Sequence, residues 1–307
     1  MSVVSMEAIQ KLREMSSAGM MDCKKALTET NGDIDAAMDW LRKKGIASAA
    51  KKADRVAAEG LVAAVVDGTK GVLVEVNCET DFVGKNADFQ ATVTKIAEAA
   101  LKANAKDVEA VKALDIDGVP ASDALTNLIA KIGENMSLRR TVQLEVSQGA
   151  VVSYLHNAAT DKTGRIGVLV ALESTAAPEV LHVLGRQIAM HIAATRPDAL
   201  TRETVDGSKL EREKNVLIEQ ARASGKPESI IEKMVEGRIN KFYEEVVLME
   251  QAFVMNPEHT VAQHVEMTAK TAEAPIKLVA FERFTVGEGI EKDAGDFAAD
   301  VAAMAGK

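Results

Sequence analysis

The architecture of this chain follows from one four-residue string that occurs twice, as Gly71-Val72-Leu73-Val74 and as Gly167-Val168-Leu169-Val170. Each copy follows a second apolar run and precedes a helical pattern. Ile96-Ala97 in the first helical pattern has a counterpart in Ile188-Ala189 of the second. One short match could arise by chance, but the shared order of elements favours a duplication. We therefore expect two related α+β subdomains, each a small antiparallel sheet backed by helices.

The strands and helices around this repeat can be placed from their patterns. Strands are expected at 60–66 and 71–77, with the turn at Asp67-Gly68, because Asp-Gly between apolar runs is typical of a hairpin. An alanine-rich helix is expected from about 88 to 104. A final strand at 276–285 should complete the second sheet.

The first 45 residues predict a compact bundle of three short helices. The second spans 21–30, and the third starts at Asp33, a good N-cap, and ends at Gly45. The apolar faces of the first and third comprise Met6, Ile9, Leu12, Ile34, Ala37, Met38 and Leu41. Such a bundle is similar to ubiquitin-associated modules, which mostly bind other proteins.

Two helical patterns flank Ser224-Gly225-Lys226-Pro227, and Gly with Pro marks a turn. They predict a helical hairpin, either projecting as an antiparallel coiled coil or folded back onto the body. A last helix is expected at 293–304. The expected division is 1–54, helical head; 55–140, first core subdomain; 141–200 with 246–286, second core subdomain; 201–245, coiled-coil hairpin; and 287–307, C-terminal module.

Composition limits the possible functions. The formal charge of −9 argues against a protein held to nucleic acid by phosphate contacts. No stretch approaches the ~20 apolar residues of a membrane span, and residues 1–11 lack a signal-peptide pattern. The two cysteines, Cys23 and Cys78, form no Cys-x-x-Cys pair and are expected to be small buried side chains. These features predict a cytoplasmic protein.

Motifs of enzymes and cofactor sites are not found. The sequence has neither a dinucleotide-binding nor a Walker-type glycine-rich loop, and it lacks a nucleophile elbow. Its five histidines include no pair at the i, i+4 spacing of a helical zinc site. We therefore expect a protein that is not an enzyme and that has no metal or cofactor of its own.

The segment Asn77-Cys78-Glu79-Thr80-Asp81-Phe82-Val83 places polar, charged and aromatic residues directly after a buried strand. Thr80 or Asp81 could cap the next turn while Phe82 packs into the core. Alternatively, Phe82 is an exposed aromatic beside a carboxylate, which is the kind of residue that dominates binding hot spots. The sequence pattern leaves both open.

Four segments resemble signatures of the elongation factor Ts family. They are 19–27 (Gly-Met-Met-Asp-Cys-Lys-Lys-Ala-Leu), 75–83, 131–135 (Lys-Ile-Gly-Glu-Asn) and 283–290 (Arg-Phe-Thr-Val-Gly-Glu-Gly-Ile). They occur in the family's order and span nearly the whole chain. The resemblance implies a helical head, a two-part core, a coiled-coil projection and a C-terminal helical module.

The resemblance also implies a function and a set of site residues. Members of the family release GDP from elongation factor Tu by protein contact. They bind this partner in both its GDP-bound and its nucleotide-free form. The resemblance implies no direct nucleic-acid, membrane or small-molecule partner. The segment that disturbs the partner's Mg²⁺ site would comprise Thr80, Asp81, Phe82 and Val83. Further contacts would comprise Gly19, Met20, Met21, Lys24, Ile132, Gly133 and His156. The stretch 157–163 is longer than the family pattern, which affects the placement of His156.

Two other classes of function stay open at this point. One is an interaction scaffold that tethers a partner through the head without promoting exchange. The other, much less favoured, is an enzyme, which would require a pocket with convergent titratable groups.

Overall fold

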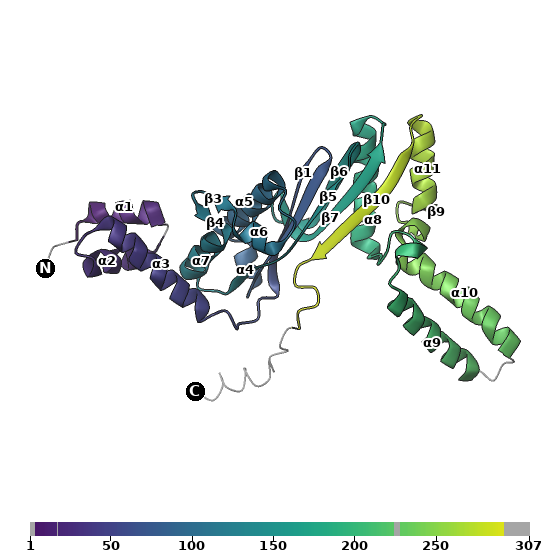
Figure 1. Ribbon diagram of the computed structural model, residues 1–307, viewed down its shortest axis with the longest axis horizontal. Helices are drawn as coiled ribbons and strands as arrows, with labels where there is room; N and C mark the ends of the chain where they lie inside the picture. Colours follow the sequence, from purple (N-terminus) through teal and green to yellow (C-terminus); the bar gives the residue numbers. More distant parts are fainter. Residues whose placement is uncertain (1–3, 17, 224–227, 292–307) are drawn as a thin grey trace.

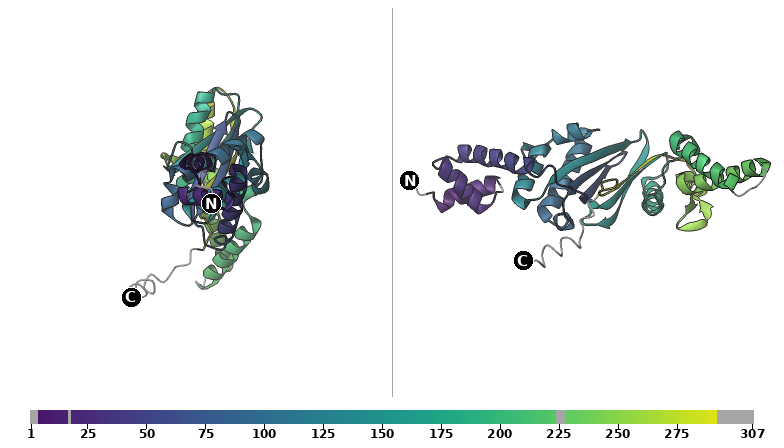
Figure 2. Two further views of the ribbon diagram at one scale, coloured as in Figure 1. Left: turned by 90° about the vertical axis from the view of Figure 1, so that its left-hand side faces the viewer. Right: turned by 90° about the horizontal axis from the view of Figure 1, so that it is seen from below.

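The computed structural model describes residues 4–16, 18–223 and 228–291. The molecule is elongated, with a helical head at one end, a body of strands and helices in the middle and a helical hairpin at the other end (Figures 1 and 2). The expected α+β class with an N-terminal helical bundle is confirmed.

The head consists of α1 (Met6–Ser16), α2 (Met20–Glu29) and α3 (Ile34–Ala50). Asp33 caps α3 as expected, because its side chain accepts a hydrogen bond from the Ala36 N–H. The buried core of the head comprises Ile9, Leu12, Cys23, Ala26, Leu27 and Ala37. Met6 is 69% exposed, so the buried face of α1 begins one turn later than the pattern predicted.

Gly45 does not end α3, contrary to the expectation from sequence. The helix continues to Ala50, and Gly45 is buried where α3 crosses α7 (Ala121–Ile132). A Cβ at Gly45 would lie 3.7 Å from the Ala130 Cβ. Small residues on both helices therefore allow this close crossing, and α3 connects the head to the body.

Six strands form the main sheet: β1 (Glu59–Asp67), β2 (Lys70–Cys78), β5 (Met136–Glu145), β6 (Gly149–Ala158), β7 (Thr163–Ser174) and β10 (Ile276–Thr285). The order is β10-β7-β1-β2-β5, with β6 paired to β7, and every pairing is antiparallel. Asp67 pairs with Lys70, so the first hairpin turns at Gly68-Thr69, one residue later than expected.

The two expected sheets are joined, because β1 pairs with β7 through Val62 with Gly164 and Ala63 with Thr163. Alternate side chains of each half then enter different cores. The inner core holds Val62, Ala64, Leu73, Val146, Val151, Leu169, Ala171, Phe284 and Val286 from both halves. The two halves of the joined sheet therefore pack on each other, with helices on the two outer faces.

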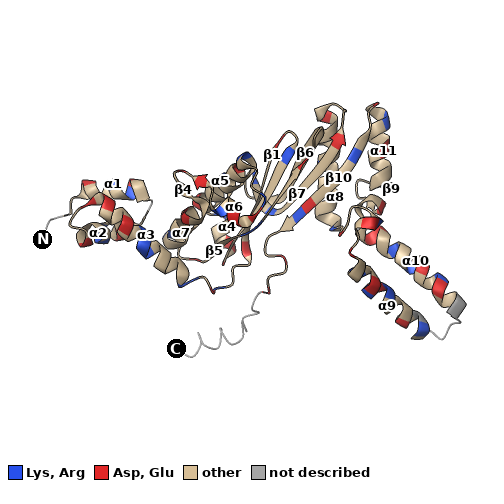
Figure 3. Ribbon diagram, viewed as in Figure 1, with Lys and Arg blue, Asp and Glu red and all other residues tan. Residues whose placement is uncertain are grey.

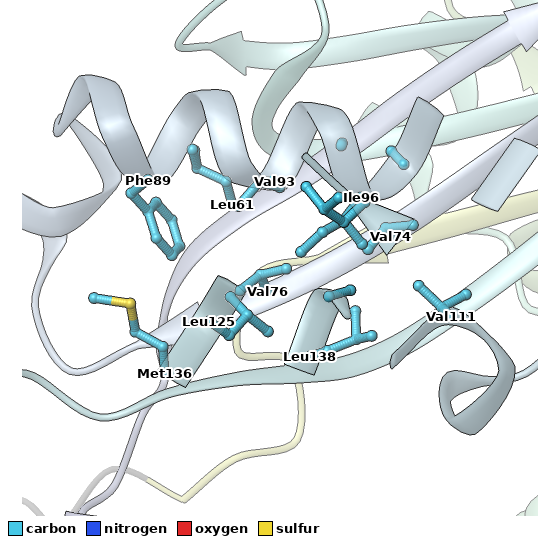
Figure 4. Close-up of a cluster of buried hydrophobic side chains, with 14 of the residues drawn as sticks. Leu61, Val74, Val76, Phe89, Val93, Ile96, Val111, Leu125, Met136 and Leu138 are labelled. Carbon is cyan, nitrogen blue, oxygen red and sulfur yellow. The ribbon is translucent and has the colours of Figure 1, made fainter. Parts of the chain in front are cut away.

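The outer face of β1, β2 and β5 is covered by α5 (Ala87–Ala103) and α7, whose side chains interlock with the strands around Phe89, Ile96 and Leu125 (Figure 4). Short elements complete this half: α4 (Asp81–Gly84), α6 (Val108–Lys112), β3 (Asp115–Ile116) and β4 (Val119–Pro120).

The outer face of β6, β7 and β10 is covered by α8 (Pro178–Thr195) and α11 (Val261–Thr271). This half also contains η1 (Arg202–Thr204), η2 (Leu248–Glu250), β8 (Ala252–Phe253) and β9 (Asn256–Thr260).

The repeat noticed in the sequence is visible in this packing. A Cβ at Gly71 would lie 2.6 Å from a methyl carbon of Val151, and a Cβ at Gly167 would lie 2.6 Å from a methyl carbon of Val62. On the first hairpin, Val62 pairs with Glu75, which is four positions after Gly71. On the second hairpin, Val151 pairs with Ala171, which is four positions after Gly167. Each glycine of the repeat is therefore in contact with the valine at the equivalent position of the other hairpin.

The helical hairpin consists of α9 (Gly207–Ala223) and α10 (Glu228–Val246). It projects from the body (Figures 1 and 2), and both arms carry charges of both signs (Figure 3). Its seam contains Leu217, Ile218, Ile231, Val235 and Ile239. The expected turn at 224–227 and the expected final helix at 293–304 lie outside the described residues. None of the described helices is both long and apolar enough to cross a membrane.

Candidate functional site

The chain leaves β2 at Cys78 and forms a single turn of helix, α4, that presents Phe82 to solvent. Phe82 is 75% exposed, whereas the next residue, Val83, is 3% exposed and packs in the core beneath α5. Successive helical residues differ by about 100° in direction, which is enough to place Phe82 in solvent while Val83 enters the core. The sequence left open whether Phe82 is buried or exposed, and the structure shows that it is exposed.

The start of this turn is held by Glu134, which follows α7. One carboxylate oxygen of Glu134 accepts the Thr80 N–H at 2.9 Å, and the other accepts the Thr80 hydroxyl at 2.7 Å. Glu79 in turn accepts the backbone N–H of Asn135. The segments 75–83 and 131–135, which the sequence analysis singled out separately, are therefore in direct contact.

Asp81 and Lys85 flank the exposed ring. The Lys85 ammonium donates to Asp81 at 3.0 Å and lies 5.5 Å from the centre of the Phe82 ring. The hydrogen bond and the charge of Lys85 lower the pKa of Asp81 below its usual value. Both charges are largely exposed, so this pair adds little stability, and it leaves an anion and a cation beside an apolar ring.

Cys78 is buried beneath the turn and forms no disulfide. Cys23 is likewise free and buried, in the core of the head. The Cys78 thiol donates to the Thr80 carbonyl, with sulfur and oxygen 3.1 Å apart. Burial, together with the nearby Glu134 and Glu59, raises the pKa of Cys78 to about 12. The thiol therefore stays protonated and is not a nucleophile at neutral pH.

A buried glutamate at the centre of β2 connects the turn's strand to the segment 283–290. Glu75 is fully buried and accepts hydrogen bonds from Arg139, Arg140 and the Gly287 N–H. The Arg140 guanidinium also stacks on Phe284, 4.1 Å from the ring centre. Sequence reasoning quoted Glu75 without giving it a role, although a carboxylate inside an apolar strand is itself a signal.

The head residues expected in partner contacts lie at the start of α2. Gly19 precedes the helix, Met20 and Met21 are 49% and 75% exposed, and Lys24 is exposed one turn later. Beside them, a cavity of about 390 Å³ is lined by residues of α2, α3 and α7, and both Gly19 and Lys131 line it. Gly19 and the segment 131–135 are thus brought near one another.

The remaining expected contacts lie at two separate places, the end of α7 and strand β6. Ile132 is half-buried, and Gly133 is exposed in the left-handed conformation that ends α7, with φ of 91°. His156 is exposed on β6 of the other subdomain, where the Tyr154 hydroxyl lies 3.1 Å from its Nδ1. β6 continues to Ala158 and β7 resumes at Thr163, so the longer 157–163 stretch mainly extends this hairpin.

Among the described residues, no three His, Cys, Asp or Glu side chains are grouped as metal ligands would be. The candidate residues lie on the exposed turn α4, at the start of α2, at the end of α7 and near the end of β6. Fold and site therefore define an elongated α+β protein with a helical head, a body built on one six-stranded antiparallel sheet and a projecting hairpin.

Comparison with known proteins identifies which such protein this chain resembles. The family description "Elongation factor TS" matches residues 79–288. The chain is 58% identical to elongation factor Ts of Paramagnetospirillum magneticum over 308 aligned positions, which cover 100% of this chain and 98% of that protein. It is 56% identical to the elongation factor Ts proteins of Rhodospirillum centenum, with 100% of both chains covered, and of Rhizobium etli, with 99% of both covered. The chain belongs to the elongation factor Ts family, which gives it a role in translation elongation.

Proposed function

We propose that this chain is a guanine nucleotide exchange factor that binds elongation factor Tu and releases GDP by displacing the partner's Mg²⁺ site. Family membership supports the exchange activity and the identity of the partner. The chain would act through contact alone, without a cofactor of its own, in the cytoplasm.

The observation that carries this proposal is the exposure of Phe82 on an anchored turn. An aromatic side chain that is 75% exposed contributes little to the stability of the free protein, because most of its apolar surface remains in water. The turn beneath it is fixed by the two Glu134 hydrogen bonds and by the buried Val83. A rigid anchor binds with little loss of conformational entropy, which favours a contact role.

The chemistry of Mg²⁺ explains why such a contact would release GDP. Mg²⁺ requires near-ideal octahedral geometry and is usually held partly by the phosphates of a nucleotide. Insertion of Phe82 would move the elements that support the ion, with Asp81 redirecting hydrogen bonds there. Metal and GDP affinity would then fall together.

Exchange of this kind is a coupling between two binding events. If the factor binds nucleotide-free partner more tightly than GDP-bound partner, GDP must weaken the factor by the same ratio. About 1.4 kcal/mol of differential binding changes nucleotide affinity tenfold. The other contact residues would contribute equally to binding of the nucleotide-free and the GDP-bound partner. They are Gly19, Met20, Met21, Lys24, Ile132, Gly133 and His156.

The proposal is tested by fluorescent-GDP release from purified elongation factor Tu, with this chain added at one tenth of the partner concentration or less. An exchange factor turns over, so substoichiometric chain should release all of the bound GDP in the presence of excess unlabelled nucleotide. A scaffold would bind the partner in a pull-down yet leave the release rate at its spontaneous value, and that result would refute the proposal.

A further inference from the structure

A cavity of about 460 Å³ lies on the second subdomain, away from the turn that carries Phe82. It is bounded by the C-terminal end of α8 and the residues that follow it, and by β10. Two arginines line it, Arg196 at the end of α8 and Arg283 near the end of β10. Neither has a role in the function proposed above.

The Arg283 guanidinium has an unused pair of donors. Its side chain is only 8% exposed, and its Nη1 donates to Glu288 at 3.1 Å. Its Nε and Nη2 are buried and have no hydrogen-bond partner among the described residues. Burial of an unpaired charged donor is costly, so these two groups call for a ligand.

The geometry of those two donors selects the ligand. Nε–H and one N–H of Nη2 lie side by side on one edge of the guanidinium plane and point the same way. That edge matches the two oxygens of a carboxylate or two oxygens of a phosphate, which accept parallel hydrogen bonds.

Among the described residues, the charged side chains around the cavity are two arginines and three carboxylates, so the cavity tolerates a single negative charge better than a double one. Arg196 supplies a second cation, and it forms no ion pair within the part of the chain that the structure describes. Burial is the main cause that lowers the pKa of Arg283, and the charges of Arg196 and Arg140 act in the same direction. The lining also contains Asp198, Glu282 and Glu288, which would repel a doubly charged phosphate more than a carboxylate. Pro197, Leu200, Val279 and Phe281 provide apolar walls for the carbon atoms beside the carboxylate.

We propose that this cavity binds a carboxylate, the side chain of an acidic protein segment, on the free Nε–Nη2 edge of Arg283 with Arg196 as the second cation. The site lies on the opposite subdomain from Phe82. It would therefore add a further point of contact with a protein partner, separate from the exchange turn and from the contacts proposed above.

The test is an NMR titration of the full chain that follows the arginine Nε–H signals. N-acetylglycine, which carries one carboxylate, is the probe, inorganic phosphate is the second arm, and chloride at equal ionic strength is the blank. We expect N-acetylglycine to give a saturable shift of the Arg283 Nε–H. A shift no larger than that with chloride would overturn the proposal, and saturation by phosphate alone would overturn the carboxylate assignment.

Arg196→Asn tests the second cation without disturbing the fold. Arg196 has φ of 53°, and Asn tolerates this left-handed conformation. The variant should weaken N-acetylglycine binding about fivefold, since one nearby charge is lost, while its Tm stays at the wild-type value. Lys277→Asn, at the other end of β10, removes an equal charge and should not change binding. If both variants weakened binding equally, the effect would come from the net charge of the protein and not from a site at Arg196, which would contradict the proposal.

Discussion

The Glu134 carboxylate accepts both hydrogen bonds that Thr80 donates, and its replacement separates anchoring from chemistry. Glu134→Ala removes two hydrogen bonds to a charged acceptor and should lower the free energy of unfolding by about 1.5–3 kcal/mol. GDP release should also slow, because the turn would no longer be fixed. Denaturant unfolding and the exchange assay together check this.

The control for that variant is Glu109→Ala, which removes an exposed carboxylate whose one ion pair among the described residues is with Lys112. We expect a change below about 0.5 kcal/mol. Wild-type exchange by Glu134→Ala at a temperature where it is folded would show that anchoring is unimportant.

At the residue scale, the sequence predicted which residues are unusual but not how they lie. The polar and aromatic cluster at 77–83 was recognisable because it interrupts an apolar pattern. Whether Phe82 is buried depends on the direction of one helical turn, and that turn is fixed by Glu134, 54 positions further along the chain. Local patterns contain no information about so distant a partner.

At the scale of elements, the two glycines of the repeat allow the two halves of the joined sheet to pack closely. Gly71→Ala and Gly167→Ala would each place a Cβ 2.6 Å from a valine methyl carbon of the other hairpin. Overpacking of this kind should cost about 1–3 kcal/mol in the free energy of unfolding, measured with urea.

Gly84→Ala is the matched control for these glycine variants. A Cβ there would have its nearest neighbour at 3.6 Å, an ordinary contact, and the residue is helical. We expect it to be neutral or stabilising by about 0.4–1 kcal/mol. Wild-type stability of both Gly71→Ala and Gly167→Ala would contradict the close packing of the two halves of the joined sheet.

The base of the helical hairpin depends on a neutral histidine. His191 is buried, its Nδ1 accepts the Val254 N–H at 3.2 Å, and its Nε2 lies 2.8 Å from the Gln251 side-chain oxygen. Gln251 in turn donates to the Glu245 carbonyl in α10. Burial lowers the pKa of His191, and likewise that of the neighbouring His264.

These lowered pKa values predict acid sensitivity. Below the unfolded-state pKa of about 6.5, the unfolded chain binds protons that the folded chain does not, so stability falls as the pH drops through that value. His191→Gln should reduce the slope of unfolding free energy between pH 7 and pH 5, although His264 still contributes. His182→Gln, an exposed change on α8, should keep the wild-type slope, and equal slopes in all three proteins would refute the role of His191.

Sequence periodicity predicted most elements because their apolar spacing is regular. β10 coincides with the expected 276–285, and the Gly-Val-Leu-Val repeat lies on β2 and β7 as expected. Gly45 was misread as a helix end, because a glycine that admits a neighbouring helix looks the same in sequence as a glycine that ends one. The joining of the two sheets likewise depends on long-range pairing that no local pattern contains.

At the scale of the whole molecule, we propose that the head, 1–54, is separable from the core. A chain beginning at about Ala53 should keep a folded core, because the helices of the head have their own buried cluster. It loses the contact of α3 with α7, including the Arg42–Asp123 ion pair at 2.7 Å, so its Tm should fall by several degrees at most. Affinity for elongation factor Tu should fall as well. Calorimetric titration checks this, and unchanged affinity would remove the head from the interface.

The central claim is that Phe82 promotes GDP release without stabilising the fold. It is tested most directly by stopped-flow release of fluorescent GDP from elongation factor Tu at saturating factor, comparing wild type with Phe82→Ala and with Val183→Ala, an exposed apolar residue on α8. We expect Phe82→Ala to slow release at least about tenfold, equivalent to a loss of about 1.4 kcal/mol, with an unchanged Tm, and Val183→Ala to match wild type. A large fall in the Tm of Phe82→Ala, with wild-type release per folded molecule, would contradict the account.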